Sequence, residues 1–162
     1  MPTPEDDNAE WVESLEQLRS RLEAESGDGL RLLENLGDNP ICCVALDASV
    51  PCIRVVWKRY ATSTQLRFIH ERLLRMLEDS RVGKILGDDT QLPMIHAEDQ
   101  RWIVENWMPR AQTAGLTTVA TKRPASYFGQ LSVDAVKSVA PEGLAIRTFE
   151  DMSQAQAWLA QA

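Results

Sequence analysis

A short apolar run that follows a helical pattern and ends in two aspartates is the feature that most constrains this chain. Residues 83–90 read Gly-Lys-Ile-Leu-Gly-Asp-Asp-Thr, and residues 67–79 before them have the apolar spacing of a helix. Such a run predicts a buried parallel strand. In open α/β sheets, ligands and partners bind at the carboxyl ends of the strands. We therefore expect a functional site near Asp88, Asp89 and Thr90.

The rest of the chain predicts strands and helices that alternate around this strand. Two stretches rich in β-forming residues, joined by a short polar turn, predict a β-hairpin at the start of the domain. The alternation that follows predicts an α/β fold: a single mixed, mainly parallel sheet of five strands with helices packed on it. The strands are expected at 41–47, 51–57, around 85–86, at 116–122 and at 144–149; the helices at 64–79, 96–115, 132–139 and from about 153; and a loop at 123–129.

The N-terminal quarter of the chain has a different pattern. Residues 1–8 are polar and contain prolines, so we expect them to be disordered. Residues 9–38 are expected to form a helical extension, with a second short helix at 30–36, and residues 39–162 to form the α/β domain.

One stripe of apolar residues defines the first helix of this extension. Its members, at spacings of four, three and four, are Trp11, Leu15, Leu18 and Leu22. Such a stripe must be buried on the domain, on a second subunit or on a partner. Because a narrow stripe suits helix–helix pairing, the sequence favours a homodimer in which these four residues form the contact.

Composition and charge exclude several classes of function. The 162-residue chain has a net charge of −7; residues 1–40, with 11 acidic residues and three arginines, contribute −8, and the remainder contributes +1. No basic stripe could neutralise phosphates, so we expect no nucleic-acid partner. No apolar run approaches the roughly 18 residues of a membrane span, and the acidic N-terminus is unlike a signal peptide. We expect a cytoplasmic protein without stable membrane insertion.

The sequence contains no pattern typical of a metal, cofactor or catalytic site. Cys42, Cys43 and Cys52 have neither zinc-ligand nor Cys-x-x-Cys spacing, and we interpret them as free thiols that act as small buried hydrophobic residues. His70 and His96 lie far from them in the sequence. Nucleophile-elbow, phosphate-loop and dinucleotide-binding motifs are absent from the sequence. We therefore predict a protein that is not an enzyme and has no metal or cofactor.

Five stretches of the chain carry a family resemblance. They are Val55–Tyr60 (VVWKRY), Ile85–Leu92 (ILGDDTQL), Glu98–Leu116 (EDQRWIVENWMPRAQTAGL), Tyr127–Val133 (YFGQLSV) and Phe149–Leu159 (FEDMSQAQAWL). Through these stretches, residues 41–160 resemble the STAS-like (SpoIIAA-like) domains of bacteria, which are related in fold to anti-sigma-factor antagonists. The run from Trp102 to Arg110 is the most specific part of the resemblance.

The resemblance implies a small α/β domain that acts by binding other proteins. Members with a known role bind a kinase and a partner complex, and carry a phosphorylatable serine or threonine at the start of the helix after the central strand. Thr90 is the hydroxyl nearest to that place, although the usual Asp-Ser-x-Gly arrangement is absent and a loop with Pro93 precedes the helix. The fold also resembles the lipid-carrying CRAL-TRIO domains.

These observations predict a functional surface and two alternative functions. The expected surface consists of Asp88, Asp89, Thr90, His96 and Trp102. Trp102 lies on a less apolar helix face than Trp107, so it either covers another element or marks a contact surface. The predicted function is protein–protein recognition without catalysis, with a protein partner or a second copy of the chain. The alternative is a small apolar ligand or lipid-binding module of CRAL-TRIO-like character, which a pocket above roughly 300 Å³ near Trp102 would favour.

Overall fold

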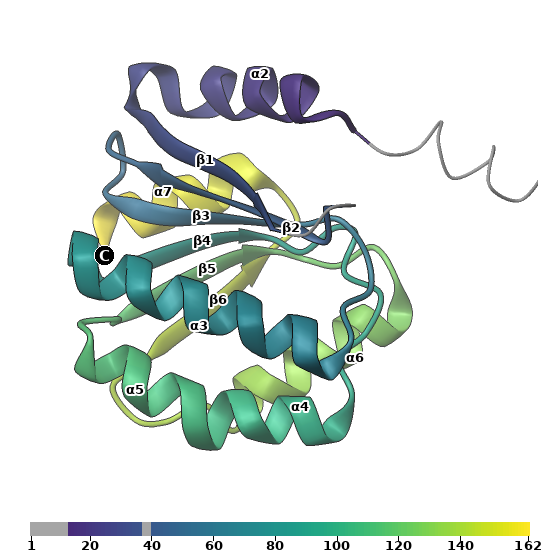
Figure 1. Ribbon diagram of the computed structural model, residues 1–162. Helices are drawn as coiled ribbons and strands as arrows, with labels where there is room; N and C mark the ends of the chain where they lie inside the picture. The colour runs from purple at the N-terminus through teal and green to yellow at the C-terminus, as the bar shows by residue number, and fades with distance from the viewer. Residues whose placement is uncertain (1–12, 37–39) are drawn as a thin grey trace, which may run out of the picture.

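A single mixed sheet organises the computed structural model, which describes residues 13–36 and 40–162. Its six strands lie in the order β1-β2-β3-β4-β5-β6 (Figure 1). β2 pairs antiparallel with both β1 and β3, and β3 to β6 run parallel to one another. The strands are β1 (Leu30–Leu36), β2 (Cys42–Asp47), β3 (Cys52–Trp57), β4 (Lys84–Asp88), β5 (Thr118–Lys122) and β6 (Ala145–Phe149).

Helices cover both faces of the sheet. Three of the connections cross between neighbouring parallel strands, and they place α3, α4, α5 and α6 on one face; α2 and α7 lie on the other (Figure 1). The helices are α2 (Leu15–Ser26), α3 (Ser63–Ser80), α4 (Ala97–Trp102), α5 (Met108–Thr113), α6 (Tyr127–Ser138) and α7 (Met152–Gln161), with one 3₁₀ turn, η1 (Gly27–Gly29), and one π-helix, η2 (Ile103–Trp107). In the part of the chain that the structure describes, no helix is long and apolar enough to cross a membrane.

The alternation of side chains along the strands divides the core into two layers. In β3, Ile53, Val55 and Trp57 point into the larger layer, under α3 to α6. Cys52 and Val56 point to the opposite face, where they pack with residues of α7 and α2 respectively. The predicted hairpin, the alternation of strands and helices and the mainly parallel sheet are confirmed.

Residues 30–36 correct the predicted fold, because they form a sixth strand and not a second helix. β1 pairs with β2 in an antiparallel register that shifts between Arg31 and Glu34, and Leu32 in this bulge has a positive φ of 53°. The extra residue brings Leu30 and Leu33 to the same face, where both pack on the α2 layer. This spacing of three imitates the periodicity of a helix. The predicted count of five strands was therefore one too low.

The apolar stripe of α2 is buried on the sheet of its own chain. Leu18 and Leu22 are fully buried against Cys43 and Val56, whereas Leu15 is 37% exposed. Leu18 and Leu22 are therefore not free to form the predicted dimer contact, because the sheet already covers them. Trp11 and residues 1–8, for which disorder is predicted, lie outside the described residues.

A buried network of charges also fixes α2 to the sheet. Arg54 of β3, 1% exposed, donates to Ser26 Oγ (3.0 Å) and pairs with the carboxylates of Glu25 and Asp47. Ser26 Oγ in turn donates to Asp47 Oδ2 (2.5 Å). Nearer the start of α2, Arg21 donates to Glu13 at 2.9 and 3.0 Å. Each buried charge in this network has an opposite charge beside it, as burial of ions requires.

The helix between β4 and β5 changes its pitch at Pro109. The Met108 amide donates to the carbonyl of Ile103, five residues earlier, so residues 103–107 form a π-helix between α4 and α5. Proline lacks an amide hydrogen and its ring clashes with the carbonyl four residues before it, so a normal α-helix cannot pass through it without a break. α5 begins at Met108, one residue before Pro109, and the wide turn displaces Trp107 relative to a regular helix.

Candidate functional site

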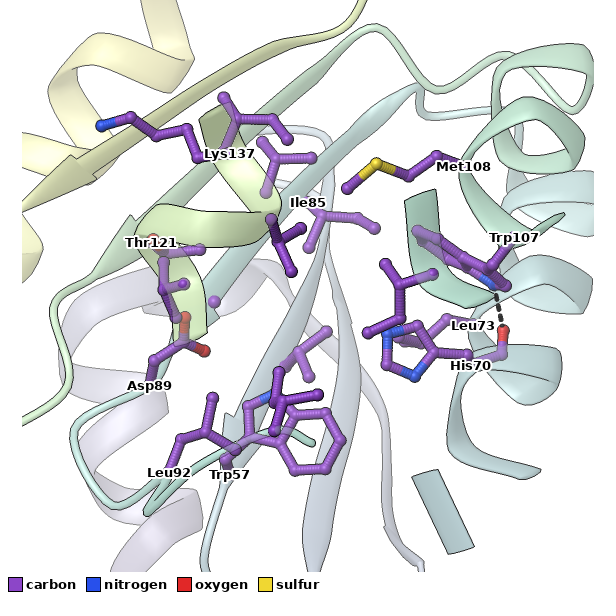
Figure 2. Close-up of a pocket in the computed structure, with 18 of the residues that line it drawn as sticks. Trp57, His70, Leu73, Ile85, Asp89, Leu92, Trp107, Met108, Thr121 and Lys137 are labelled. Carbon is purple, nitrogen blue, oxygen red and sulfur yellow. Dashed lines mark hydrogen bonds between the residues drawn. The ribbon is translucent and has the colours of Figure 1, made fainter. Parts of the chain in front are cut away.

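A cavity of about 130 Å³ lies between the sheet and the helices α3 to α6. Its walls are mainly apolar, and Figure 2 shows side chains from the sheet and from the helices that cover it pointing into the cavity. The floor is formed by alternate residues of four parallel strands, the ceiling by α3, η2, α5 and α6. The lining residues are Val55, Trp57, His70, Leu73, Ile85, Gly87, Asp89, Leu92, Ile95, Ile103, Trp107, Met108, Val119, Thr121, Val133, Val136, Lys137, Leu144 and Ile146.

Gly87 of β4 forms part of the cavity floor and has no side chain that could fill the space above it. Its neighbours across the sheet are Val55 of β3 and Thr121 of β5. A Cβ atom at position 87 would lie 3.1 Å from Thr121 Cγ2 and 3.4 Å from Asp89 Oδ1. Asp89 Oδ1 and the Thr121 methyl group therefore lie over Gly87, at the carboxyl end of the parallel strands.

Asp89 places a carboxyl group in the apolar cavity. It follows β4 directly, and its backbone amide donates to the Lys122 carbonyl (3.2 Å), which fixes the direction of its side chain. The group is 6% exposed, and no donor among the described residues bonds to its carboxyl oxygens. Burial, reinforced by the neighbouring charge of Asp88, raises the pKa of Asp89 from 3.8 to about 7. Near neutral pH this carboxyl group can therefore donate or accept a proton.

Thr121, beside Asp89, turns its methyl group toward the cavity floor at Gly87. Its Oγ1 atom is buried and has no hydrogen-bond partner among the residues that the structure describes. A buried polar atom without a partner costs about 1–3 kcal/mol, and most buried polar atoms in folded proteins are bonded. Because this oxygen is fully inaccessible, the carboxyl group of Asp89 is left as the polar group at this end of the apolar cavity.

The opposite end of the cavity is closed by His70 and Trp107. Their rings meet edge to face with centroids 5.0 Å apart, and the Trp107 indole donates to the His70 carbonyl oxygen (2.6 Å). His70 Nδ1 lies 2.8 Å from the Leu66 carbonyl oxygen, so Nδ1 carries the proton of the neutral ring. Burial lowers the pKa of His70 to about 4, and the imidazole is neutral at physiological pH.

One side of the cavity is less well closed than the rest. Val119, Val133, Val136 and Ile146 are only partly buried, and Lys137, whose stem lines the cavity, is exposed. These residues belong to β5, α6 and β6, so the cavity reaches the surface between α6 and the edge of the sheet. Lys137 Nζ lies 3.4 Å from Thr148 Oγ1 at this opening.

Of the predicted site residues, only Asp89 lines the cavity. Asp88 points to the other face of the sheet, where its Oδ2 accepts from Arg21 (3.1 Å). Its Oδ1 accepts from the amide (3.1 Å) and hydroxyl (2.6 Å) of Thr90, so it caps the turn after β4. Neighbouring residues of a strand point to opposite faces, and the two aspartates therefore do not act on one ligand.

The remaining two predicted residues lie outside the cavity. His96 is exposed, with Nε2 2.8 Å from the Tyr60 hydroxyl oxygen. Trp102 is partly buried: its ring packs on the core, and the guanidinium carbons of Arg67 and Arg110 lie 5.2 and 6.0 Å from the ring centroid. It therefore covers another element, which was one of the two alternatives, and it contributes nothing to the cavity wall.

The cavity also contains residues that the sequence did not single out as functional, namely Gly87, Thr121 and Trp107. Gly87 lies in the stretch that organises the chain, two residues before Asp89, and a glycine inside a strand often marks a close approach to a ligand. Thr121 lies 32 residues beyond Asp89, and only the parallel pairing of β4 and β5 brings the two together. No three metal-ligating side chains come close enough to hold an ion in the described residues.

Comparisons of the chain with protein-family models, with curated proteins and with solved structures gave no match. The resemblance to STAS-like domains therefore stays a prediction, and functional conclusions depend on the geometry of the cavity.

Proposed function

We propose that this domain binds a small, mainly apolar molecule in the cavity between its sheet and the helices α3 to α6, without performing chemistry on it. The observation that carries the proposal is the apolar cavity itself, with the buried carboxyl group of Asp89 at one end of it. Burial of this carboxyl group destabilises the folded protein, and such a cost is typical of functional sites.

The size of the cavity limits the ligand. Pockets for drug-sized ligands usually have about 300–1,000 Å³, and an engineered apolar cavity of about 150 Å³ binds benzene. The volume of about 130 Å³ favours a ligand about as large as one aromatic ring. A lipid of the kind that CRAL-TRIO domains carry is much larger, so this part of the predicted alternative is not supported.

Thermal unfolding in the presence of toluene tests this proposal. A ligand at ten times its Kd stabilises the folded state by about 1.4 kcal/mol, which raises the Tm of a domain of this size by about 3–6 °C. Val136→Phe should abolish the rise, because the larger side chain fills the cavity. Val139→Phe is the matched control, since Val139 is 63% exposed just after α6. Equal rises in both variants would contradict binding in the cavity.

A second candidate function, recognition of a second copy of the chain, is favoured by an exposed apolar surface at the start of α6. Tyr127, Phe128 and Leu131 are 68%, 65% and 47% exposed within little more than one helical turn. Exposed apolar groups that gather in this way are typical of contact surfaces. This surface would replace the buried α2 stripe as the contact of the predicted homodimer.

Sedimentation velocity tests this second candidate. The wild-type chain should sediment as a dimer, and a variant with Tyr127→Ser and Phe128→Ser as a monomer. Phe68→Ser, which removes a 63% exposed aromatic side chain from α3, is the matched control and should leave the dimer intact. A wild-type monomer at concentrations of tens of micromolar would contradict self-association through this surface.

A further inference from the structure

We infer that the ligand of this cavity is a small cation, a protonated nitrogen base about as large as one ring, which donates N–H hydrogen bonds to the carboxylate of Asp89. The inference rests on the proposed function and adds the chemical class of the ligand. It starts from the carboxyl group itself, which lies over Gly87 on the cavity floor and receives no hydrogen bond from the described residues.

The carboxyl oxygens of Asp89 are within reach of a molecule in the cavity. In the described part of the chain, the side-chain oxygens and nitrogens that are both fully inaccessible and unpaired belong to Arg54, Asp99 and Thr121, and none belongs to Asp89. Asp89 is one of the residues that line the cavity. A donor group inside the cavity can therefore contact an Asp89 oxygen.

No basic side chain among the described residues pairs with Asp89. Arg21 binds Asp88 on the opposite face of the sheet, at 3.1 Å. Lys137 lines the cavity with its stem, but its Nζ atom lies 3.4 Å from Thr148 Oγ1 at the opening. His70 at the far end is neutral, because burial lowers its pKa to about 4. Since a buried carboxylate requires an opposite charge beside it, a cationic ligand would complete this site.

The charges around Asp89 disfavour other head groups. An anion would meet both Asp89 and the charge of Asp88, which already raises the pKa of its neighbour. A neutral hydroxyl would donate one hydrogen bond but would leave the carboxylate without an opposite charge, and a hydrocarbon would supply neither. Among cations, a planar one with delocalised charge is less strongly hydrated than an ammonium group, and two parallel N–H groups match both oxygens of a carboxylate.

The probe for this inference is 2-aminopyridine, which has the size of one ring and takes up a proton on its ring nitrogen near neutral pH. The protonated form presents two neighbouring N–H groups on one edge. Aniline has nearly the same shape but lacks the ring nitrogen, and toluene lacks both nitrogens. All three suit a cavity of about 130 Å³.

Isothermal titration of the full chain with these three compounds at pH 7 tests the inference. Wild-type protein should bind 2-aminopyridine at least about tenfold more tightly than aniline or toluene, because hydrogen bonds to a charged group are the stronger kind. Asp89→Asn should remove this preference and leave toluene binding unchanged. Asp79→Asn, which removes a charge from an exposed position at the end of α3, is the matched control and should keep the preference.

Proton release provides a second readout, which a merely structural role of Asp89 would not change. At pH 6 the free protein holds a proton on Asp89, whose pKa is about 7, and the bound cation requires the carboxylate. This proton therefore passes to the buffer. Titrations in buffers with different ionisation enthalpies should show close to one proton released for each 2-aminopyridine bound, and none for toluene.

The outcomes separate this inference from the proposed function. If toluene or aniline binds as tightly as 2-aminopyridine, if Asp89→Asn keeps the preference, or if no proton is released, the cavity binds apolar ligands but the cation assignment is wrong. If none of the three compounds binds, or if Val136→Phe binds all of them as the wild type does, the proposed function itself fails and the inference fails with it.

Discussion

Replacing Asp89 with asparagine should stabilise this protein at alkaline pH. The carboxyl group lies fully inside an apolar cavity, where its charged form loses the hydration that it has in the unfolded chain. The folded pKa is about 7 and the ordinary value is 3.8. Asparagine has nearly the same shape and is never charged, so it removes this cost and keeps the packing.

The sign and size of the effect follow from the two pKa values. Below pH 3.8 the carboxyl group is protonated in both states, and Asp89 has no pH-dependent effect on stability. As the pH rises to about 7, the unfolded chain ionises while the folded chain keeps its proton, so wild-type stability falls. One unit of pKa corresponds to about 1.36 kcal/mol. The difference between 3.8 and about 7 therefore costs the wild type about 4 kcal/mol at pH 8.

Urea unfolding of wild-type and Asp89→Asn protein at pH 4.5 and pH 8 measures this effect. The stability difference in favour of the variant should grow by about 3 kcal/mol between these two pH values, because the wild type already loses part of its stability by pH 4.5. Asp79→Asn removes a charge from an exposed position and should change stability by less than about 0.5 kcal/mol at both. A difference that stays constant with pH, or a variant that is less stable at pH 8, would refute the reasoning.

Three further substitutions test other parts of the structure. His70→Gln should make the stability of the protein less sensitive to acid. Burial lowers the pKa of His70 from 6.5 to about 4, so wild-type stability falls by about 3 kcal/mol as the pH falls from 6.5 to 4. Urea unfolding at several pH values should show a smaller fall in the variant. Trp107→Ala should lower the free energy of unfolding by about 3–5 kcal/mol, and Trp102→Ala by less than half of that. Trp107 is 4% exposed, whereas Trp102 is only partly buried. Equal losses of stability in denaturant unfolding would contradict this difference between the two tryptophans. Arg54→Met should cost about 3–5 kcal/mol, since Asp47 would remain buried without its cation, and a loss below 1 kcal/mol at neutral pH would show that the network does not hold α2.

Much of the fold could be predicted because local pattern and tertiary structure agree. Ile53, Val55 and Trp57 alternate with Arg54 and Val56, and the two sets do lie on opposite faces of β3. The position of the site was also predictable in part. Asp89 follows a buried parallel strand, and the carboxyl ends of such strands are the usual place for ligands.

β1 could not be predicted because a β-bulge interrupts the two-residue alternation of its side chains. A regular strand repeats every two residues, whereas Leu30 and Leu33 share a face only because Leu32 is inserted between pairs of β1 and β2. Spacing of three is typical of helices, and no rule of local sequence separates the two cases. The pairing partner β2 determines the outcome.

The start of α6 was placed too late for a similar reason. Tyr127 and Phe128 are exposed, so they add no apolar periodicity, and Gly129 suggests a loop. In the structure Ser126 caps the helix by accepting from the Gly129 amide (3.0 Å), and the glycine is needed because a side chain there would collide with the Leu92 carbonyl. The contact between these two distant segments is invisible in the sequence.

The most direct test of binding in the cavity is methyl NMR of the full chain during titration with toluene. The methyl resonances of Val55, Ile85 and Val119, which line the cavity floor, should shift and saturate together. Those of Leu18 and Leu22, which lie under α2 on the opposite face of the sheet, should not move. If the cavity methyl groups stay unchanged up to the solubility limit of toluene, the cavity is not a ligand site and the proposed function is wrong.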